Sequence, residues 1–425
     1  MSIQTGEKGI LTLLMTVYFL ATPLISIFGS FLGTEAAQLL INLAIGILLV
    51  LCIAKKGVQR IGRALLVLLA ASAVIILGII LHPDYSEWYN HPSYGITSSF
   101  LNLQSGIWAV LIFSLYDNTE DLLTDLKIAA LMVFLAYSYK FLGAMRRGYW
   151  LVAKVDGSGF NEAPYDMEFG YRMLFTSAVF GASGFVKNIA LDKILFLVCI
   201  VFIFLGGSRG PIVWAVILPL IIACVKFKNY ERRKKRKVLA VLAVFVLLLL
   251  IVWINWDPIR TSLLSLMDSY GIKSRTLRAV LDGSFYDSNG RNYVYMHAFR
   301  RIGTGGLLGH GFYGDRVYIG QFFRWGYPHN IFLEFFIQFG YLGGTVLSLL
   351  LAYGVFIGFR RCKTPADWAV FLSLLVCSAR LLVSGSFWYE SKFWALAAFL
   401  LQFESRSIMV LQAPKMVCTA FSEDS

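Results

Sequence analysis

The sequence predicts an all-α, polytopic membrane protein, and three observations support this fold class. Hydrophobic residues make up 58% of the 425-residue chain, and the mean hydropathy of +0.68 exceeds what a soluble core needs, so apolar surface must face lipid. The apolar residues form runs that approach the roughly 17 to 20 residues needed to cross a bilayer. One long polar stretch, residues 255–340, interrupts them. We therefore expect about 12 transmembrane helices and one large extracytoplasmic loop containing short helices.

The expected spans divide into clear and weak runs. The clear runs are residues 10–28, 36–54, 64–81, 194–205, 211–225, 238–254, 341–359, 369–383 and 393–403. The weak runs, 98–116, 128–144 and 170–185, contain polar residues and glycines, which favour helices facing a polar interior. The first run lacks a small-residue cleavage site and is expected to be a retained helix.

These runs define three parts of the chain. Residues 1–254 hold transmembrane helices 1–9, residues 255–340 form the extracytoplasmic loop with the candidate catalytic residues, and residues 341–425 hold helices 10–12 and a cytoplasmic tail. Basic clusters at 55–63, 232–237 and 360–363 fall on one side, which the positive-inside rule makes cytoplasmic, together with both termini. The acidic segment 117–125 falls on the same side, against the general bias.

Composition also limits the partners. A net charge of +13 can indicate nucleic acid, but in a chain with many spans it indicates basic loops beside anionic membrane lipids, so we expect no nucleic-acid partner. The outer loop carries nine Lys and Arg against six Asp and Glu. A basic excess outside the cytoplasm departs from the positive-inside rule, so we expect functional residues in this loop. The six cysteines show neither a disulfide framework nor zinc-ligand spacing.

Two arginines on the outer side are candidate anion ligands. Arg209 lies at a sharp turn beside Gly207, Gly210 and Pro211, where it either reaches lipid headgroups or forms a fixed phosphate clamp. Arg291 follows the turn sequence Asp287-Ser288-Asn289-Gly290, which should open a helix over residues 292–301. A helix start favours anions. The alternative is that Arg291 is one of several solvated arginines.

His329 is the candidate base. It precedes a helix predicted to begin near Asn330, whose amide can cap it, while Pro328 forces an extended approach. The positive end of that helix opposes protonation, so the imidazole should be neutral, with a pKa near its reference value of about 6.5. A merely capping or packed histidine is the alternative. Glu334, one turn further on, either orients His329 or caps the helix.

Other cations are weaker candidates for substrate contact. Arg380 lies inside the eleventh span and should face the bundle interior, because an unpaired charge in lipid costs a few kcal/mol. Lys140 and Arg172 fall near the outer face, and Arg300 lies at the far end of the 292–301 helix, where it balances the dipole or meets headgroups. Walker, Gly-x-Ser-x-Gly and Asp-x-Asp signatures and a glycosidase carboxylate pair are all missing from the sequence, so we expect no metal and no cofactor.

Four motifs in a fixed order resemble the O-antigen ligase and polymerase superfamily. They are Gly206-Gly207-Ser208-Arg209-Gly210-Pro211, Gly290-Arg291, Leu308-Gly309-His310-Gly311 and Pro328-His329-Asn330-x-x-x-Glu334. The similarity covers residues 194–359. It implies a glycosyltransferase of the bacterial cytoplasmic (inner) membrane, with its active site on the extracytoplasmic side and a polyprenyl-pyrophosphate-linked glycan as donor.

The resemblance implies a role for each central residue. Arg209 and Arg291 would hold the donor pyrophosphate, and His329 would activate the acceptor hydroxyl, without a metal or nucleotide sugar. Attack opposite the leaving group predicts inversion. A polymerase, which extends lipid-linked repeat units, is favoured over a ligase, which transfers the glycan to lipid A core or protein. A chain-length regulator protein stays open as a partner, and a lipid-linked glycan transporter and a structural scaffold remain alternatives from other classes.

Overall fold

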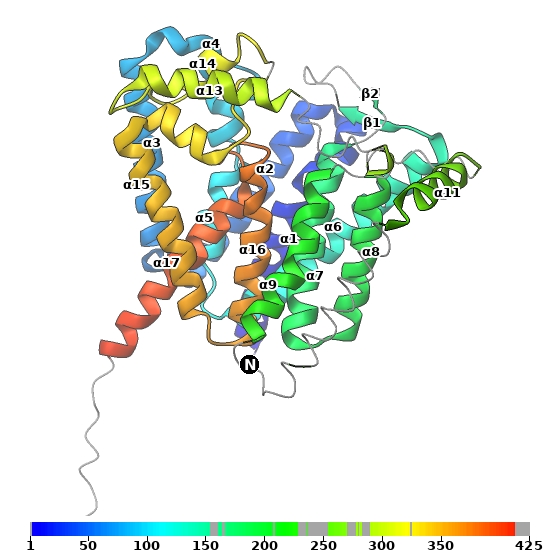
Figure 1. The fold of residues 1–425 in the computed structure, drawn as a ribbon. Coiled ribbons are helices and arrows are strands. Elements are labelled where there is room, and N and C mark those ends of the chain that lie inside the picture. Colours follow the sequence, from blue (N-terminus) through cyan, green and yellow to red (C-terminus); the bar gives the residue numbers. More distant parts are fainter. Residues whose placement is uncertain are drawn as a thin grey trace, which may run out of the picture.

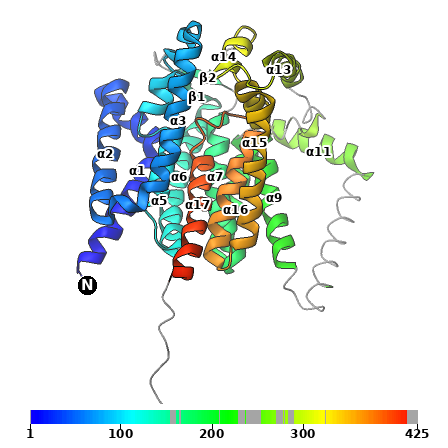
Figure 2. The ribbon, with the colours of Figure 1, turned by 90° about the vertical axis from the view of Figure 1, so that its left-hand side faces the viewer.

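The computed structural model describes residues 2–153, 160–163, 166–206, 209–227, 236, 254–269, 278, 280–282, 290–323 and 325–412. Long helices stand side by side in a bundle, and short helices cover the end opposite the N-terminus (Figures 1 and 2). Within the described residues, seven helices are long and apolar enough to cross a membrane. The prediction of an all-α, polytopic membrane protein is therefore confirmed.

The seven helical spans are Lys8–Leu32, Thr34–Lys56, Val58–Leu81, Thr119–Arg147, Arg209–Phe227, Ile331–Arg361 and Pro365–Leu382. The expected count of about 12 is not confirmed. Of the other expected spans, α7 (Met167–Lys187) and α17 (Ser391–Gln412) carry polar residues, and α8 (Ala190–Gly206) has only 17 residues. Residues 98–116 are broken into a π-helical turn (Thr97–Leu101), a 3-10 turn (Gly106–Trp108) and α5 (Ala109–Ser114). Nearly all of the span at 238–254 lies outside the described residues.

The helices that form these spans are α1 (Ser2–Leu32), α2 (Thr34–Lys56), α3 (Gly62–Leu81), α6 (Thr119–Arg147), α9 (Arg209–Phe227), α15 (Ile331–Arg361) and α16 (Pro365–Ser378). The other described elements are α4 (Ser86–Tyr89), α11 (Trp256–Ser269), α13 (Arg291–Gly305), α14 (Gly314–Ile319) and the 3-10 turns Val58–Ile61, Pro83–Tyr85 and Ala379–Leu382. An antiparallel hairpin of β1 (Trp150–Ala153) and β2 (Phe160–Ala163), with Trp150 opposite Ala163, was not predicted from the sequence. Its strands are too short to show a two-residue alternation.

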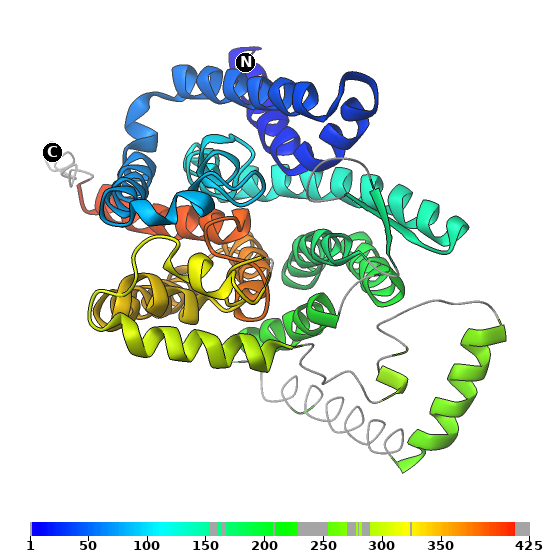
Figure 3. The same ribbon diagram turned by 90° about the horizontal axis from the view of Figure 1, so that it is seen from above.

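The bundle is held together by close helix contacts. Helix α7 packs against α8, α9 and α16, and α1 packs against α2 and α6. In Figure 3, seen from above, α13 runs alongside α15 and α11 lies at the periphery. The α7–α8 contact depends on small residues, because a Cβ on Gly181 would lie 2.7 Å from the Phe196 ring, and one on Gly184 would lie 2.8 Å from the Lys193 nitrogen. Small residues let membrane helices approach closely.

The acidic segment 117–125 has a local explanation. Its carboxylates form ion pairs with cations of neighbouring segments: Lys56–Asp117 (2.8 Å), Arg60–Asp117, Lys8–Asp121 (3.1 Å) and Lys187–Glu120. The acidic segment and these basic residues therefore lie at the same end of the bundle as the N-terminus (Figure 1). Acidic residues contribute little to the positive-inside rule. Here they pair with the basic residues at this end of the bundle and offset their charge.

Helix α15 is broken at Gly340, where φ is 65° and ψ is −168°. Such a break leaves backbone groups without helical partners. Residues 306–311 cross the helix at this point and bond to them: His310 N to Ile337 O (2.8 Å), Gly311 N to Gln338 O (2.9 Å), Tyr341 N to Gly306 O (3.1 Å) and Leu342 N to Leu307 O (3.1 Å). The backbones approach so closely that a Cβ on Gly309 or Gly340 would collide with the other chain segment.

Alanine at Gly309, where φ is 76°, is therefore expected to destabilise the protein. The loss should be about 2–5 kcal/mol, because a non-glycine residue in the left-handed region costs ~1–2 kcal/mol and overpacking adds ~1–3 kcal/mol. Denaturant unfolding of the purified protein in detergent measures the loss. The matched control is Gly303→Ala in α13, where an added Cβ meets nothing within 4 Å. Equal unfolding midpoints for the two variants would contradict the proposed crossing.

Candidate functional site

The candidate residues come from elements at the end of the bundle opposite the N-terminus. Helix α13 packs against α14 and α15, and the start of α15 contacts the 3-10 turn Ala379–Leu382. The predicted helix after the 287–290 turn is confirmed, since α13 begins at Arg291 with Gly290 as its N-cap residue in the left-handed conformation. Residues 287–289 themselves lie outside the described part of the chain.

Asn330 positions the segment that carries the histidine. As predicted, it caps α15, because its side-chain oxygen accepts hydrogen bonds from the backbone nitrogens of Phe332 (3.0 Å) and Leu333 (3.3 Å). Its side-chain nitrogen donates to the carbonyl of Leu382, at 3.1 Å. The side-chain amide of Asn330 therefore joins the start of α15 to the 3-10 turn that contains Arg380.

His329 occupies a restricted position at this junction. Its φ of 57° lies in the left-handed region, which is uncommon for a residue with a Cβ. Its half-buried ring lies 5.2 Å from the ring of Trp325 and 4.7 Å from that of Tyr327, measured between centroids. Nδ1 has no hydrogen-bond partner within the described residues. Backbone and aromatic neighbours therefore orient the imidazole without bonding to that nitrogen.

Three guanidiniums lie close enough to act on His329. Burial, and then the charges of Arg291, Arg380 and Arg316, lower the pKa of His329 to about 3. The imidazole is therefore neutral at pH 7, as predicted from the sequence. The pKa lies well below the expected value near 6.5, because neighbouring charges and burial, rather than the helix end alone, oppose protonation.

Arg291 and Arg209 reach this region from separate helices. The half-buried Arg291 begins α13, and its guanidinium has no hydrogen-bond or ion-pair partner in the described part of the chain. Arg209 begins α9 and is also half-buried. A Cβ on the adjacent Gly210 would lie 2.7 Å from the Tyr171 hydroxyl oxygen. The Arg380 guanidinium stacks on the Tyr171 ring, 3.9 Å from its centroid, so the start of α9 adjoins the same cluster.

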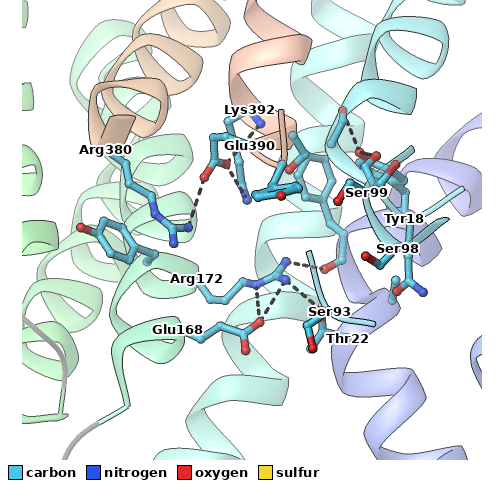
Figure 4. A pocket seen from close by; sticks show the side chains of 18 of the residues that line it. Tyr18, Thr22, Ser93, Ser98, Ser99, Glu168, Arg172, Arg380, Glu390 and Lys392 are labelled. Carbon is cyan, nitrogen blue, oxygen red and sulfur yellow. Dashed lines mark hydrogen bonds and ion pairs between the residues drawn. The ribbon is translucent and has the colours of Figure 1, made fainter. Parts of the chain in front are cut away.

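Arg380 faces inward, as the sequence predicted. Its Nη1 donates to Oε2 of Glu390 at 3.1 Å, and Oε1 of Glu390 lies 3.2 Å from Nζ of Lys392. These three side chains and Arg172 line a cavity of about 500 Å³ (Figure 4). Arg172 pairs there with Glu168 at 3.1 Å.

The other candidate residues lie elsewhere. Lys140 pairs with Asp166, the N-cap residue of α7, at 2.6 Å. Arg300 is exposed on α13. Glu334 is buried, and no contact between Glu334 and His329 is found among the described residues. Its oxygens instead accept hydrogen bonds from Arg316 (3.0 Å), Ser386 (2.5 Å) and the backbone nitrogen of Phe387 (3.3 Å).

Sequence reasoning missed Arg316. This arginine of α14 is fully buried, with 0% exposure, and it forms ion pairs with Asp315 and Glu334. Its guanidinium also lies over the rings of Tyr313, Tyr327 and Tyr389, at 4.7, 5.3 and 5.5 Å from the centroids. The available signal was the adjacent Asp315-Arg316 pair in an aromatic segment, together with Glu334 and Gln338 one helical turn apart, which share a helix face.

Comparison with known proteins adds one finding. Residues 194–348, just over a third of the chain, match the family model described as O-Antigen ligase. No curated protein and no solved structure matches the chain. The matched region includes Arg209, Arg291, Arg316 and His329. Over residues 194–348, the chain is therefore similar to the O-Antigen ligase family, in agreement with the resemblance that its motifs indicated.

Proposed function

We propose that this protein is an inverting membrane glycosyltransferase that takes its glycan from a polyprenyl-pyrophosphate carrier. The observation that supports the proposal most strongly is the neutral imidazole of His329 beside three guanidiniums, in the part of the chain that matches the O-Antigen ligase family. Cations suit a pyrophosphate leaving group, and a neutral imidazole suits proton removal from a hydroxyl.

The proposed reaction divides the work between these groups. Arg209 and Arg291 hold the donor pyrophosphate, and their guanidiniums stabilise the charge that develops on it. His329 removes the proton from the acceptor hydroxyl, whose oxygen bonds to the anomeric carbon as the bond from that carbon to the pyrophosphate oxygen breaks. The polyprenyl pyrophosphate leaves with the bonding electrons. Attack from the opposite face inverts the anomeric centre.

Donor binding would activate the base. With a resting pKa of about 3, His329 is a weak base while the guanidiniums around it are not neutralised. A bound pyrophosphate would offset their charge and favour the imidazolium form, so the pKa of His329 would rise towards its reference value. In this way proton removal would depend on the presence of the donor.

Topology and acceptor belong to the same proposal. Twelve crossings, including the span at 238–254, would put the active site on the extracytoplasmic side of the bacterial inner membrane. Of two possible acceptor reactions, we propose first the polymerisation of lipid-linked repeat units. Transfer to lipid A core or protein is the second, and it is equally consistent with the match to the O-Antigen ligase family. A lipid-linked glycan transporter would bind the donor without forming product.

Reconstitution tests the activity directly. The purified protein in liposomes, given a synthetic polyprenyl-pyrophosphate repeat unit, is expected to extend the chain, and with lipid A core as acceptor a ligase would form the conjugate. His329→Ala should lower the rate roughly 10²- to 10⁴-fold, with an unchanged unfolding temperature. Undiminished product formation in His329→Ala would remove the base from the mechanism, and no product with either acceptor would favour transport.

The pyrophosphate ligands have a separate test. Arg209→Gln and Arg291→Gln should each lower kcat/KM for the donor about 10- to 100-fold, since a hydrogen bond to a charged group contributes ~1.5–3 kcal/mol. Initial rates at varied donor concentration give this ratio. Arg360→Gln, which removes an exposed arginine at the far end of α15, should leave it unchanged. A loss confined to one of the two arginines would show that they do not act together.

The pKa of His329 provides the third test. Nitrogen-15 NMR of histidine-labelled protein should show an imidazole that stays neutral down to pH about 5 without ligand, and inorganic pyrophosphate should raise its pKa. Arg291→Gln should raise it as well, because one opposing charge is lost. A pKa near 6.5 that does not respond to pyrophosphate would contradict the coupling of donor and base.

A further inference from the structure

The cavity beside Arg380 is a polar chamber distinct from the pyrophosphate ligands. Its volume of about 500 Å³ falls within the roughly 300–1,000 Å³ of small-molecule sites. Its walls come from α1, residues 93–106, the start of α7 and residues 380–392. The side chains labelled in Figure 4 come from all four segments.

Ten of the twenty residues that line the cavity carry a hydroxyl group. They are Tyr18, Thr22, Ser93, Tyr94, Ser98, Ser99, Ser105, Tyr171, Tyr389 and Ser391. Hydroxyls both donate and accept hydrogen bonds, and tyrosine rings add flat apolar faces. This combination suits a sugar, which offers several hydroxyls and an apolar face. It does not suit an isoprenoid chain, which makes no hydrogen bonds.

The charges in the cavity do not cancel. Three cations, Arg172, Arg380 and Lys392, face two carboxylates, Glu168 and Glu390, which leaves one positive charge in excess. Burial alone would raise the pKa of Glu390, but the charges of Lys392 and Arg380 outweigh burial and lower it. Glu390 is therefore ionised, and this single carboxylate lies between two cations. One further anionic group would balance the cluster.

The cavity adjoins the proposed base. Tyr94 and Tyr389 line it, and both rings lie 6.4 Å from the ring of Tyr327. The Tyr327 ring is in turn 4.7 Å from that of His329. The charge of Arg380, which also lines the cavity, acts on His329. A lining tyrosine ring and the ring of Tyr327 therefore lie between the cavity and the imidazole.

We propose that this cavity is the acceptor subsite and that it takes a sugar residue carrying one carboxylate, such as a uronic acid. The carboxylate binds between Arg380 and Lys392, and the ring hydroxyls bond to the serine and tyrosine hydroxyls. The reactive hydroxyl then belongs to a neighbouring sugar of the same acceptor, which lies outside the cavity. This assignment rests on the proposed glycosyltransferase function, and it adds the chemical class of the acceptor.

Direct binding tests the assignment without turnover. Purified protein is titrated with a galacturonic acid disaccharide and with the matched neutral galactose disaccharide, using ligand-observed NMR. The acidic disaccharide should bind at least about tenfold more tightly, the effect expected for one added charge-assisted hydrogen bond. Lys392→Gln should abolish this preference and leave the neutral disaccharide unaffected. The control, Arg360→Gln, removes one positive charge elsewhere and should change neither affinity.

A second variant guards against a folding defect in Lys392→Gln. Ser98→Phe adds bulk to the cavity without touching the ion pairs, and it should weaken the binding of both disaccharides. Equal affinity of the wild-type protein for acidic and neutral disaccharides would overturn the carboxylate preference. If Lys392→Gln instead lost affinity for inorganic pyrophosphate, the cavity would belong to the donor. Neither result depends on product formation, so failure of the glycosyltransferase proposal would be recognised separately, in the reconstitution.

Discussion

The buried charge of Arg316 is the constraint on which the end of the bundle opposite the N-terminus depends. A guanidinium with 0% exposure is tolerable only when it is paired and hydrogen-bonded, because the desolvation of an unpaired ion costs several kcal/mol. Its ion-pair partners Asp315 and Glu334 come from α14 and α15, and its Nη2 also bonds to Ser386 (2.7 Å) in the loop before α17. One side chain thus joins three segments from distant parts of the chain, and His329 lies between two of them.

Neighbouring guanidinium charges act strongly on the imidazole of His329, although its Nδ1 has no hydrogen-bond partner among the described residues. The pairing of the other charges explains this combination. Arg316 pairs with Asp315 and Glu334, and Arg380 shares the Glu390 carboxylate with Lys392. Arg291 contributes a charge that no described carboxylate balances. The histidine therefore lies where positive potential exceeds negative potential, an arrangement that favours an anionic ligand and an uncharged ring together.

Much of this arrangement could be predicted from the sequence, and the reasons for the remainder are physical. Hydropathy identified the fold class because lipid-facing helices must be apolar, and local turn and capping rules located α13 and the Asn330 cap. The expected span at 170–185 became α7, a largely buried helix that packs against other helices and can carry polar residues, so hydropathy alone does not count it. The ion pair between Arg316 and Glu334 joins residues 18 positions apart, and no local periodicity reports such a contact. The roles of Lys140 and Glu334 in ion pairs likewise depend on tertiary neighbours.

The crossing of residues 306–311 over the break in α15 has a further consequence for which substitutions the segment tolerates. The four bonds that hold it run between main-chain atoms, so they are indifferent to the side chains that the segment displays. Leu307 and Leu308 are exposed there, at 70% and 78%. Substitutions at these two outward positions can therefore change the exposed surface of residues 306–311 while the main-chain bonds beneath keep their geometry.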